Sequence, residues 1–290
     1  MSRVTLVVID PQVDFHEGGS LAVNGALADS QRTADLIDEH GDYITDIFVT
    51  LDSHHRTHIA HGVFWKDSNG NQPEPFTIIK CSDVSDGKWT PKDYTHLEHA
   101  KFYTSELEAK GRFKLCIWPE HCLIGTPGHA VINSINDSLQ EWAGRNMNTI
   151  QYIMKGTNCM VEMYSALCAE VEMANDPSTS LDFGLIERLN EADHIIVCGQ
   201  ALSHCVNFTT RDILKHWKRS PSRLYLLTDA SSPVLGFESD AQNFIGDMQE
   251  AGVTITTSTS VMDIIHAIDV KEMESEDRQQ KQQIAEEGEE

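Results

Sequence analysis

The chain has 290 residues, 22 Lys and Arg against 45 Asp and Glu, and a formal charge of −23 at pH 7. An acidic surface of this kind repels phosphate groups, which argues against nucleic-acid binding and against docking on an anionic membrane. No segment reaches the roughly 18–20 apolar residues of a membrane span, and the N-terminus lacks the features of a signal peptide, so we expect a cytoplasmic protein. The composition therefore favours a protein that handles a small molecule or a protein partner.

Short apolar runs alternate with helical patterns along most of the chain. Runs that end in a polar residue or a glycine are typical of strands buried on both faces of a parallel sheet. They occur at residues 4–10, 43–52, 149–155, 194–199, 223–229 and 253–259. Helical spacing of apolar residues occurs at 131–142, 206–217, 239–251 and 261–268. This order predicts an α/β fold with a doubly wound, mostly parallel β-sheet and helices on both faces.

Three segments depart from this alternation. Residues 62–117 are rich in Gly, Pro, Asn and Asp and are too long for an ordinary connection, so we expect a lid or a small subdomain. Residues 171–184 form a second extension. Residues 271–290 hold eight acids and three bases with almost nothing apolar, which predicts a disordered tail. We therefore expect a single domain over residues 1–270, followed by this tail.

Chemically active residues follow four of the predicted strands. Ligands of open α/β sheets bind beyond the carboxyl ends of the strands. Asp10, Asp52 and Lys155 end three strands, and Cys205 follows a fourth after a Gly-containing turn. A helix N-terminus and a lysine both favour the nucleophilic thiolate, and a carboxylate can carry its proton. We therefore interpret Cys205 as a candidate nucleophile, the alternative being a buried structural cysteine.

A histidine-rich segment follows the second of these strands. Within LDSHHRTHIAH (51–61), Asp52 and His54 are two residues apart, and His58 follows four residues later; His121 lies in WPEHC. One carboxylate with two or three imidazoles suits Zn²⁺, Fe²⁺ or Mn²⁺. The spacing alone is weak evidence, because a solvated histidine-rich loop has the same composition. We assign no role to His55, His61, His96 and His99.

Five motifs in chain order resemble those of a known family. They are VVIDPQVDF followed by GGSLAV and NGA (7–26), TLDSHHRTH (50–58), WPEHCLIGTPG (118–128), MKG (154–156) and CGQALSHCV (198–206). The chain resembles the nicotinamidase branch of the isochorismatase-like cysteine hydrolases. The resemblance implies the isochorismatase-like fold and a metal-dependent amidohydrolase that converts nicotinamide to nicotinic acid and ammonia through a thioester, in NAD salvage.

The same resemblance implies roles for the residues at the strand ends. Cys205 would attack the amide carbonyl, Asp10 would be the general base and acid, and Lys155 would hold the proton network. The oxyanion hole would consist of the backbone N–H groups of Ala201 and Cys205, after a cis peptide bond between Gln200 and Ala201.

The resemblance also implies how the metal and the substrate are held. The ligands of one divalent ion, with zinc ahead of iron or manganese, would be Asp52, His54 and His121, with His58 as a candidate fourth. In this family the metal binds the pyridine nitrogen of nicotinamide. The substrate pocket would include Phe15, Trp118, Tyr164 and Gln200.

Departures from the family keep two alternatives open. The W-H-P of the family's metal motif is Ser53-His54-His55 here, and both insertions flank the site. One alternative is a hydrolase of the same superfamily that acts on another small amide, a ureido or carbamoyl compound or isochorismate. The other is a non-catalytic binding protein on the same fold. We expect a homo-oligomer with a small-molecule amide substrate and with no nucleic-acid or membrane partner.

Overall fold

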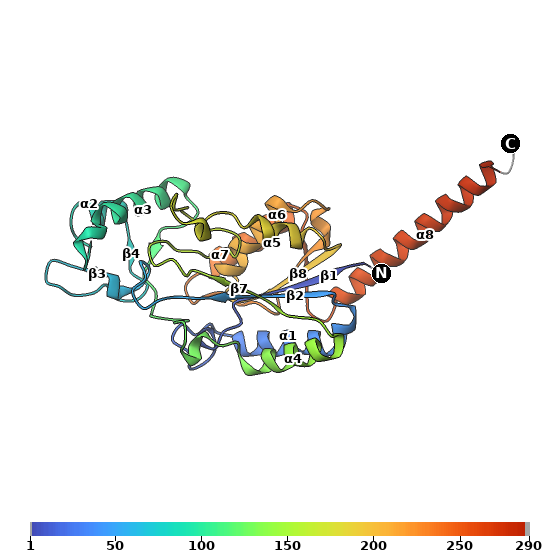
Figure 1. The fold of residues 1–290 in the computed structure, drawn as a ribbon, viewed down its shortest axis with the longest axis horizontal. Coiled ribbons are helices and arrows are strands. Elements are labelled where there is room, and N and C mark those ends of the chain that lie inside the picture. Colours follow the sequence, from blue (N-terminus) through green and yellow to red (C-terminus); the bar gives the residue numbers. More distant parts are fainter. Residues whose placement is uncertain (1, 288–290) are drawn as a thin grey trace.

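The computed structural model describes residues 2–287, which are built around one six-stranded parallel sheet (Figure 1). The strand order is β10-β9-β8-β1-β2-β7. The strands are β1 Val4–Ile9, β2 Asp46–Asp52, β7 Gln151–Lys155, β8 His194–Gly199, β9 Leu224–Leu227 and β10 Thr254–Thr256. Each of the six predicted strands is present, which confirms the doubly wound α/β fold.

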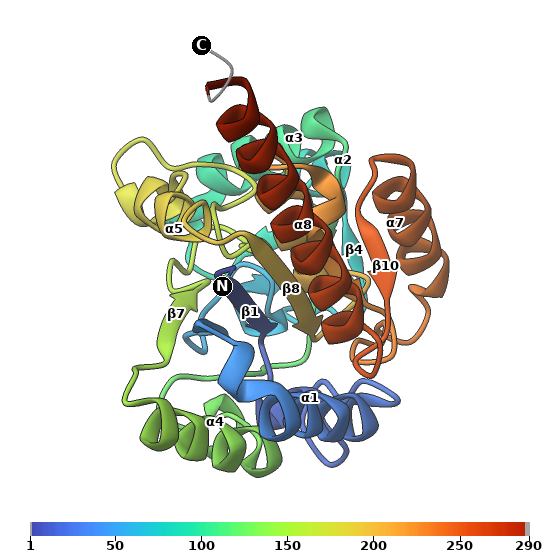
Figure 2. The ribbon, with the colours of Figure 1, turned by 90° about the vertical axis from the view of Figure 1, so that its right-hand side faces the viewer.

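Helices cover both faces of this sheet (Figures 1 and 2). One face carries α1 Ala26–His40 and α4 Asn133–Asn146; the other carries α5 Phe183–Leu189, α6 Cys205–His216 and α7 Glu238–Glu250. Alternate residues of a strand point to opposite faces. Accordingly, Leu6 and Val8 pack in the cluster with α1 and α4, whereas Val7 and Ile9 pack in the cluster with α5, α6 and α7. The continuous apolar run of β1 is therefore buried on both sides.

The strand β7 differs from the expectation of burial on both faces. It lies at the edge of the sheet, beside β2. Tyr152 and Met154 on this strand are exposed, whereas Lys155 at its end is buried. The apolar run 149–155 therefore predicts the strand correctly but not its place in the sheet.

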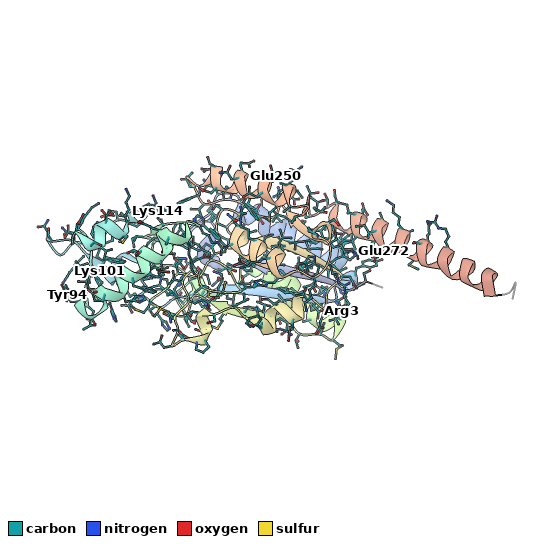
Figure 3. All side chains as sticks on the ribbon, turned by 90° about the horizontal axis from the view of Figure 1, so that it is seen from above. Arg3, Tyr94, Lys101, Lys114, Glu250 and Glu272 are labelled. Carbon is teal, nitrogen blue, oxygen red and sulfur yellow. The ribbon has the colours of Figure 1, made fainter. Side chains whose placement is uncertain are left out.

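Residues 62–117 form a lobe beyond the carboxyl ends of the strands (Figure 1). The lobe contains β3 Trp65–Lys66, β4 Ile78–Ile79, α2 Cys81–Ser85, β5 Thr90–Pro91, α3 Leu97–Lys110 and β6 Leu115–Cys116. Figure 3 places its residues Tyr94 and Lys101 at the opposite end of the molecule from Glu272. Trp65 and Tyr103 of the lobe are fully buried in the same cluster as α5, α6 and α7. The lobe therefore packs directly on the core next to the strand ends.

The C-terminal helix α8, Val261–Glu287, includes residues 271–287 of the segment that the sequence predicts as a disordered tail. Its first turns pack against the sheet through Val261 and Ile265, and its later part extends away from the body (Figure 1). Residues 271–287 contain no Gly or Pro and are rich in Glu, Gln, Lys and Arg, which favour a helix without any packing. Residues 288–290 lie outside the described part. Among the described residues, no helix combines the length and hydropathy of a membrane span.

The contact between α1 and α4 can be tested at Trp142. Its side chain is fully buried, and its Nε1–H donates to the carbonyl oxygen of Gly41 at 2.9 Å. Trp142→Ala leaves a cavity and removes one of the two hydrogen bonds to the Gly41 carbonyl oxygen, the other being that from the Ile44 N–H, so we expect the free energy of unfolding in urea to fall by about 3–5 kcal/mol. Met147→Ala, at an exposed position after the same helix, should stay within about 0.5 kcal/mol of the unaltered chain. Equal losses in the two variants would contradict this packing.

Candidate active site

Lys155, at the end of β7, lies at the centre of a buried cluster. Its Nζ is 2.9 Å from Asp10 Oδ2, 3.0 Å from Asp52 Oδ1 and 3.4 Å from Cys205 Sγ. It also donates to the carbonyl oxygen of Met163 at 3.2 Å. The residues predicted at four strand ends are therefore in contact, because parallel strands bring their carboxyl ends to one edge of the sheet.

Asp10 is oriented by its backbone and by Thr50. The residue has a φ of 44°, in the left-handed region that few non-glycine residues adopt. Thr50 Oγ1 accepts from the Asp10 N–H at 3.0 Å and donates to Asp10 Oδ1 at 2.5 Å. These contacts leave Asp10 Oδ2 to face Lys155, so the carboxylate is held from both sides.

Burial determines the protonation states of this cluster. Burial raises the pKa of the Cys205 thiol well above its usual range, and the Lys155 ammonium opposes this only in part. Burial also raises the pKa of Asp10, again against the effect of Lys155. The pKa of Lys155 is raised because Asp10 and Asp52 outweigh its burial. Lys155 thus favours the thiolate, as predicted, whereas burial, Asp10 and Asp52 favour the thiol.

The segment before α6 brings free backbone donors to Cys205. Gly199 ends β8 with a φ of 114°, and a Cβ there would lie 2.1 Å from the carbonyl oxygen of Ile9, so a side chain is excluded. The peptide bond between Gln200 and Ala201 is cis, as the resemblance implies. Within residues 2–287, the N–H groups of Ala201 and Cys205 have no hydrogen-bond acceptor. Two free donors beside a nucleophile are what an oxyanion hole requires.

Three buried histidines, His54, His61 and His121, converge near Asp52. A ring nitrogen of each lies within 4.8 Å of those of the other two. The Nδ1 atom of each histidine faces a backbone carbonyl oxygen. His54 Nδ1 lies 3.3 Å from that of Gly156, His61 Nδ1 lies 3.1 Å from that of Arg56, and His121 Nδ1 lies 2.8 Å from that of Pro119. A carbonyl oxygen only accepts, so each Nδ1 carries a proton and each Nε2 is free to offer a lone pair.

The arrangement around Asp52 fits a divalent cation. Asp52 Oδ2 lies 2.9 Å from His54 Nε2 and 3.2 Å from His121 Nε2, and the buried His61 Nε2 has no partner among the described residues. Burial opposes the charge of Asp52, but His54 and Lys155 hold the pKa of this carboxyl well below its usual range. A carboxylate and imidazole lone pairs repel each other at these distances unless a proton or a cation lies between them. The donors are those that Zn²⁺, Fe²⁺ or Mn²⁺ prefer.

The structure shows that His61, and not His58, faces the histidine cluster, a distinction that the sequence spacing does not make. The Nδ1 of His58 accepts from the N–H of Ala60 at 3.1 Å, and its Nε2 donates to the carbonyl oxygen of Val161 at 3.1 Å. Both ring nitrogens of His58 therefore hold the backbone, and His58 is not in the converging set. His61, to which we assigned no role, takes that place. The path of the loop decides this, and the sequence carries no signal for it.

Gly156 explains why a glycine follows the lysine in the MKG motif. Its φ is 72°, and a Cβ at this position would lie 2.9 Å from His54 Cε1. Its carbonyl oxygen also accepts from His54 Nδ1. The glycine thus lets the end of β7 approach the histidine cluster closely.

A cavity beside Cys205 contains three of the four residues predicted for the substrate pocket. Phe15, Trp118 and Tyr164 line it together with Cys205. The indole Nε1–H of Trp118 donates to Tyr164 Oη at 3.0 Å, which fixes the two rings relative to each other. The aromatic lining suits a flat, largely apolar ring.

The fourth predicted residue, Gln200, points elsewhere. Its side chain is buried, and its Nε2 donates to Asp29 Oδ2 of α1 at 2.9 Å. It is not part of the cavity lining. The structure therefore places Gln200 beside the site without bringing its side chain into the pocket.

Two titratable side chains that were not singled out from the sequence, Glu162 and His204, also line the cavity. Glu162 is buried, its Oε1 accepts from the Met163 N–H at 3.0 Å, and burial raises its pKa. His204 directly precedes Cys205, and burial lowers the pKa of its imidazole to about 3. The sequence did carry signals for both residues: Glu162 is an acid within the otherwise apolar run VEMY, and His204 is a histidine next to the candidate nucleophile.

Comparison with known proteins agrees with these features. The chain is 25% identical over 262 residues to the nicotinamidase of Acinetobacter baylyi, covering 90% of this chain and 95% of that protein. It is 27% identical over 211 residues to the nicotinamidase/pyrazinamidase of Mycobacterium tuberculosis, covering 73% and 78%. No family model matches the chain.

Solved nicotinamidases, pyrazinamidases and an isochorismatase-family protein share the fold. One of them is the pyrazinamidase of Pyrococcus horikoshii in complex with zinc, with a TM-score of 0.54 and 21% identity over 88% of this chain and 99% of that one. In sequence and in fold, the chain is therefore similar to the nicotinamidase branch of the isochorismatase-like cysteine hydrolases, which confirms the resemblance drawn from its motifs.

Proposed function

We propose that the chain is a metal-dependent cysteine amidohydrolase that converts nicotinamide to nicotinic acid and ammonia, a reaction of NAD salvage. The observation that carries the proposal is the buried contact of Lys155 with Asp10, Cys205 and Asp52, beside three convergent histidines. The similarity to two curated nicotinamidases supports the substrate. The single domain over residues 1–270, the homo-oligomer and the cytoplasmic location stay predictions.

The metal site is proposed to consist of Asp52, His54, His121 and, as an addition to the predicted set, His61. The Nδ1–H bonds of the histidines to backbone carbonyls support this set, because such partners fix the ring and leave Nε2 for the metal. Zinc is the first candidate, since a pyrazinamidase of the same fold has been solved with it. When bound, the ion supplies a Lewis acid that holds the ring nitrogen of the substrate.

The residues of the cluster divide the reaction between them. Asp10 takes the proton from Cys205 Sγ while the sulfur adds to the amide carbon, and the oxyanion accepts hydrogen bonds from the N–H groups of Ala201 and Cys205. Asp10 then protonates the amide nitrogen, and ammonia leaves a thioester behind. Asp10 next takes a proton from water, which adds to the thioester carbon. The C–S bond then breaks, nicotinic acid leaves, and Asp10 returns the proton to Cys205 Sγ. Lys155 balances the charge of Asp10 throughout.

The nucleophile and the base can be tested by substitution. Cys205→Ala removes the attacking atom and should abolish ammonia release from nicotinamide. Asp10→Asn keeps the shape of the side chain but cannot take a proton, so we expect kcat to fall by about 10²–10⁴-fold. Cys81→Ala, a change at a partly exposed cysteine of the lobe, is the control and should leave kcat unchanged. Turnover by Cys205→Ala would contradict the mechanism.

The substrate is tested by a panel of small compounds. Metal-loaded enzyme should release ammonia from nicotinamide with a higher kcat/KM than from a ureido acid or a carbamoyl compound, and should not hydrolyse isochorismate. The aromatic cavity and the histidine cluster beside it are the physical reason. If the enzyme releases ammonia from another amide but not from nicotinamide, the amidohydrolase mechanism is supported and the proposed substrate is wrong.

The metal set is tested by metal content at a fixed free zinc concentration. We expect one zinc ion per chain, lost in His54→Ala and His61→Ala because each variant removes an inward-facing ring nitrogen. The control is His55→Ala, at an exposed neighbour, which should keep the ion. His58→Ala should keep zinc but unfold at a lower temperature, because His58 holds backbone groups. If His58→Ala lost zinc and His61→Ala kept it, the proposed set would be wrong.

A further inference from the structure

The cavity at Cys205 is small. Only about 20 Å³ of it can be filled by water, which is room for about one water molecule. A pyridine ring with its carboxamide is several times larger than a water molecule. A wall of the cavity must therefore move before an amide reaches Cys205 Sγ.

One wall of the cavity borders a groove that is large enough for a small molecule. The groove has about 280 Å³ of space and lies between α6, α7 and the segment around Phe113. His204 lines both the groove and the cavity. Its ring lies 5.1 Å from those of Trp118 and Tyr164 in the cavity and 4.7 Å from that of Phe237 in the groove, centroid to centroid. His204 therefore separates the two spaces.

Two other large depressions have no lining residue in common with the cavity. One of about 480 Å³ lies along residues 17–28, and one of about 570 Å³ lies beside Arg219 and Asp269. The lack of shared lining residues favours the groove at His204 as the side from which the cavity opens.

The ring of His204 is held by a single local hydrogen bond. Its Nδ1 lies 2.8 Å from Ser203 Oγ, which also accepts from the Val234 N–H at 3.1 Å. The buried hydroxyl of Ser203 needs an acceptor for its own hydrogen, and His204 Nδ1 supplies it. Rotation of the ring out of the cavity breaks this one bond and leaves the backbone in place.

The groove suits a neutral planar amide. Its walls include Phe113, Phe208 and Phe237, and the exposed side-chain amide of Asn243 can pair with a carboxamide. Its two guanidinium groups already face acids: Arg112 lies 3.3 Å from Glu170 and 3.5 Å from Asp212, and Arg211 lies 2.6 Å from Asp247. With Asp240 also in the lining, these acids leave no excess of positive charge in the groove, so an anionic acid product gains no net attraction there.

We propose that this groove is the access path of the amide substrate and that His204 is the gate between the path and Cys205. The proposal rests on the proposed function for the identity of the substrate. The route to Cys205 can be tested without turnover, because a small neutral alkylating amide must take the same route.

The first test blocks the groove at a surface position. Asn243 is exposed on α7, so Asn243→Trp fills the groove without touching the reacting groups. The rate of Cys205 alkylation by iodoacetamide in the metal-free chain, followed by peptide mass spectrometry, should fall about tenfold, and kcat/KM for nicotinamide should fall by a similar factor. Asn24→Trp, which fills the depression along residues 17–28, is the matched control and should change neither rate.

The second test removes the gate. His204→Ala should join the cavity to the groove and raise the alkylation rate of Cys205 about tenfold. It should also raise kcat/KM for a bulkier amide, such as quinoline-3-carboxamide, relative to kcat/KM for nicotinamide. His204→Phe keeps the space filled and should alkylate as slowly as the unaltered chain. Unchanged alkylation in both Asn243→Trp and His204→Ala, or slower alkylation in Asn24→Trp alone, would overturn the proposal. These rates stay informative even if nicotinamide is not hydrolysed.

Discussion

The buried ammonium group of Lys155 is the contact on which the rest of the site depends. A buried charge is stable only when it is paired and hydrogen-bonded, and here Asp10, Asp52 and the carbonyl oxygen of Met163 surround it. The two carboxylates come from the ends of β1 and β2, and β2 lies between β1 and β7 in the sheet. Cys205 follows β8, on the other side of β1, so the pairing of four adjacent strands assembles the acids, the lysine and the nucleophile together.

Asp52 links this cluster to the histidines. Its Oδ1 pairs with Lys155, while its Oδ2 faces the Nε2 atoms of His54 and His121. The site that would hold a metal and the site that would attack an amide thus share one carboxylate. Both parts are buried, which raises the pKa of the Cys205 thiol, and the aromatic cavity beside it has room for little water. Chemistry of this kind requires a controlled entrance, which is the role proposed for His204.

Sequence patterns predict the fold and the strand-end residues because parallel strands leave little freedom at their carboxyl ends. Asp10, Asp52, Lys155 and Cys205 meet for this reason. The loop residues were less predictable: His61, not His58, joins the histidine cluster, because the loop uses both nitrogens of His58 for backbone contacts. The side chain of Gln200 turns toward Asp29 on another element. The low apolar content of residues 271–290 does not predict the helix that continues as far as Glu287.

Acid-quenched turnover of nicotinamide by the metal-loaded enzyme tests the role of the Lys155 cluster most directly. Peptide mass spectrometry should find a nicotinoyl group on Cys205 during the steady state. Lys155→Met, which removes the charge that holds Asp10 and the thiol together, should show no such adduct. An enzyme that turns over nicotinamide through an adduct on another residue, or equal acylation of Cys205 in Lys155→Met, would contradict this arrangement.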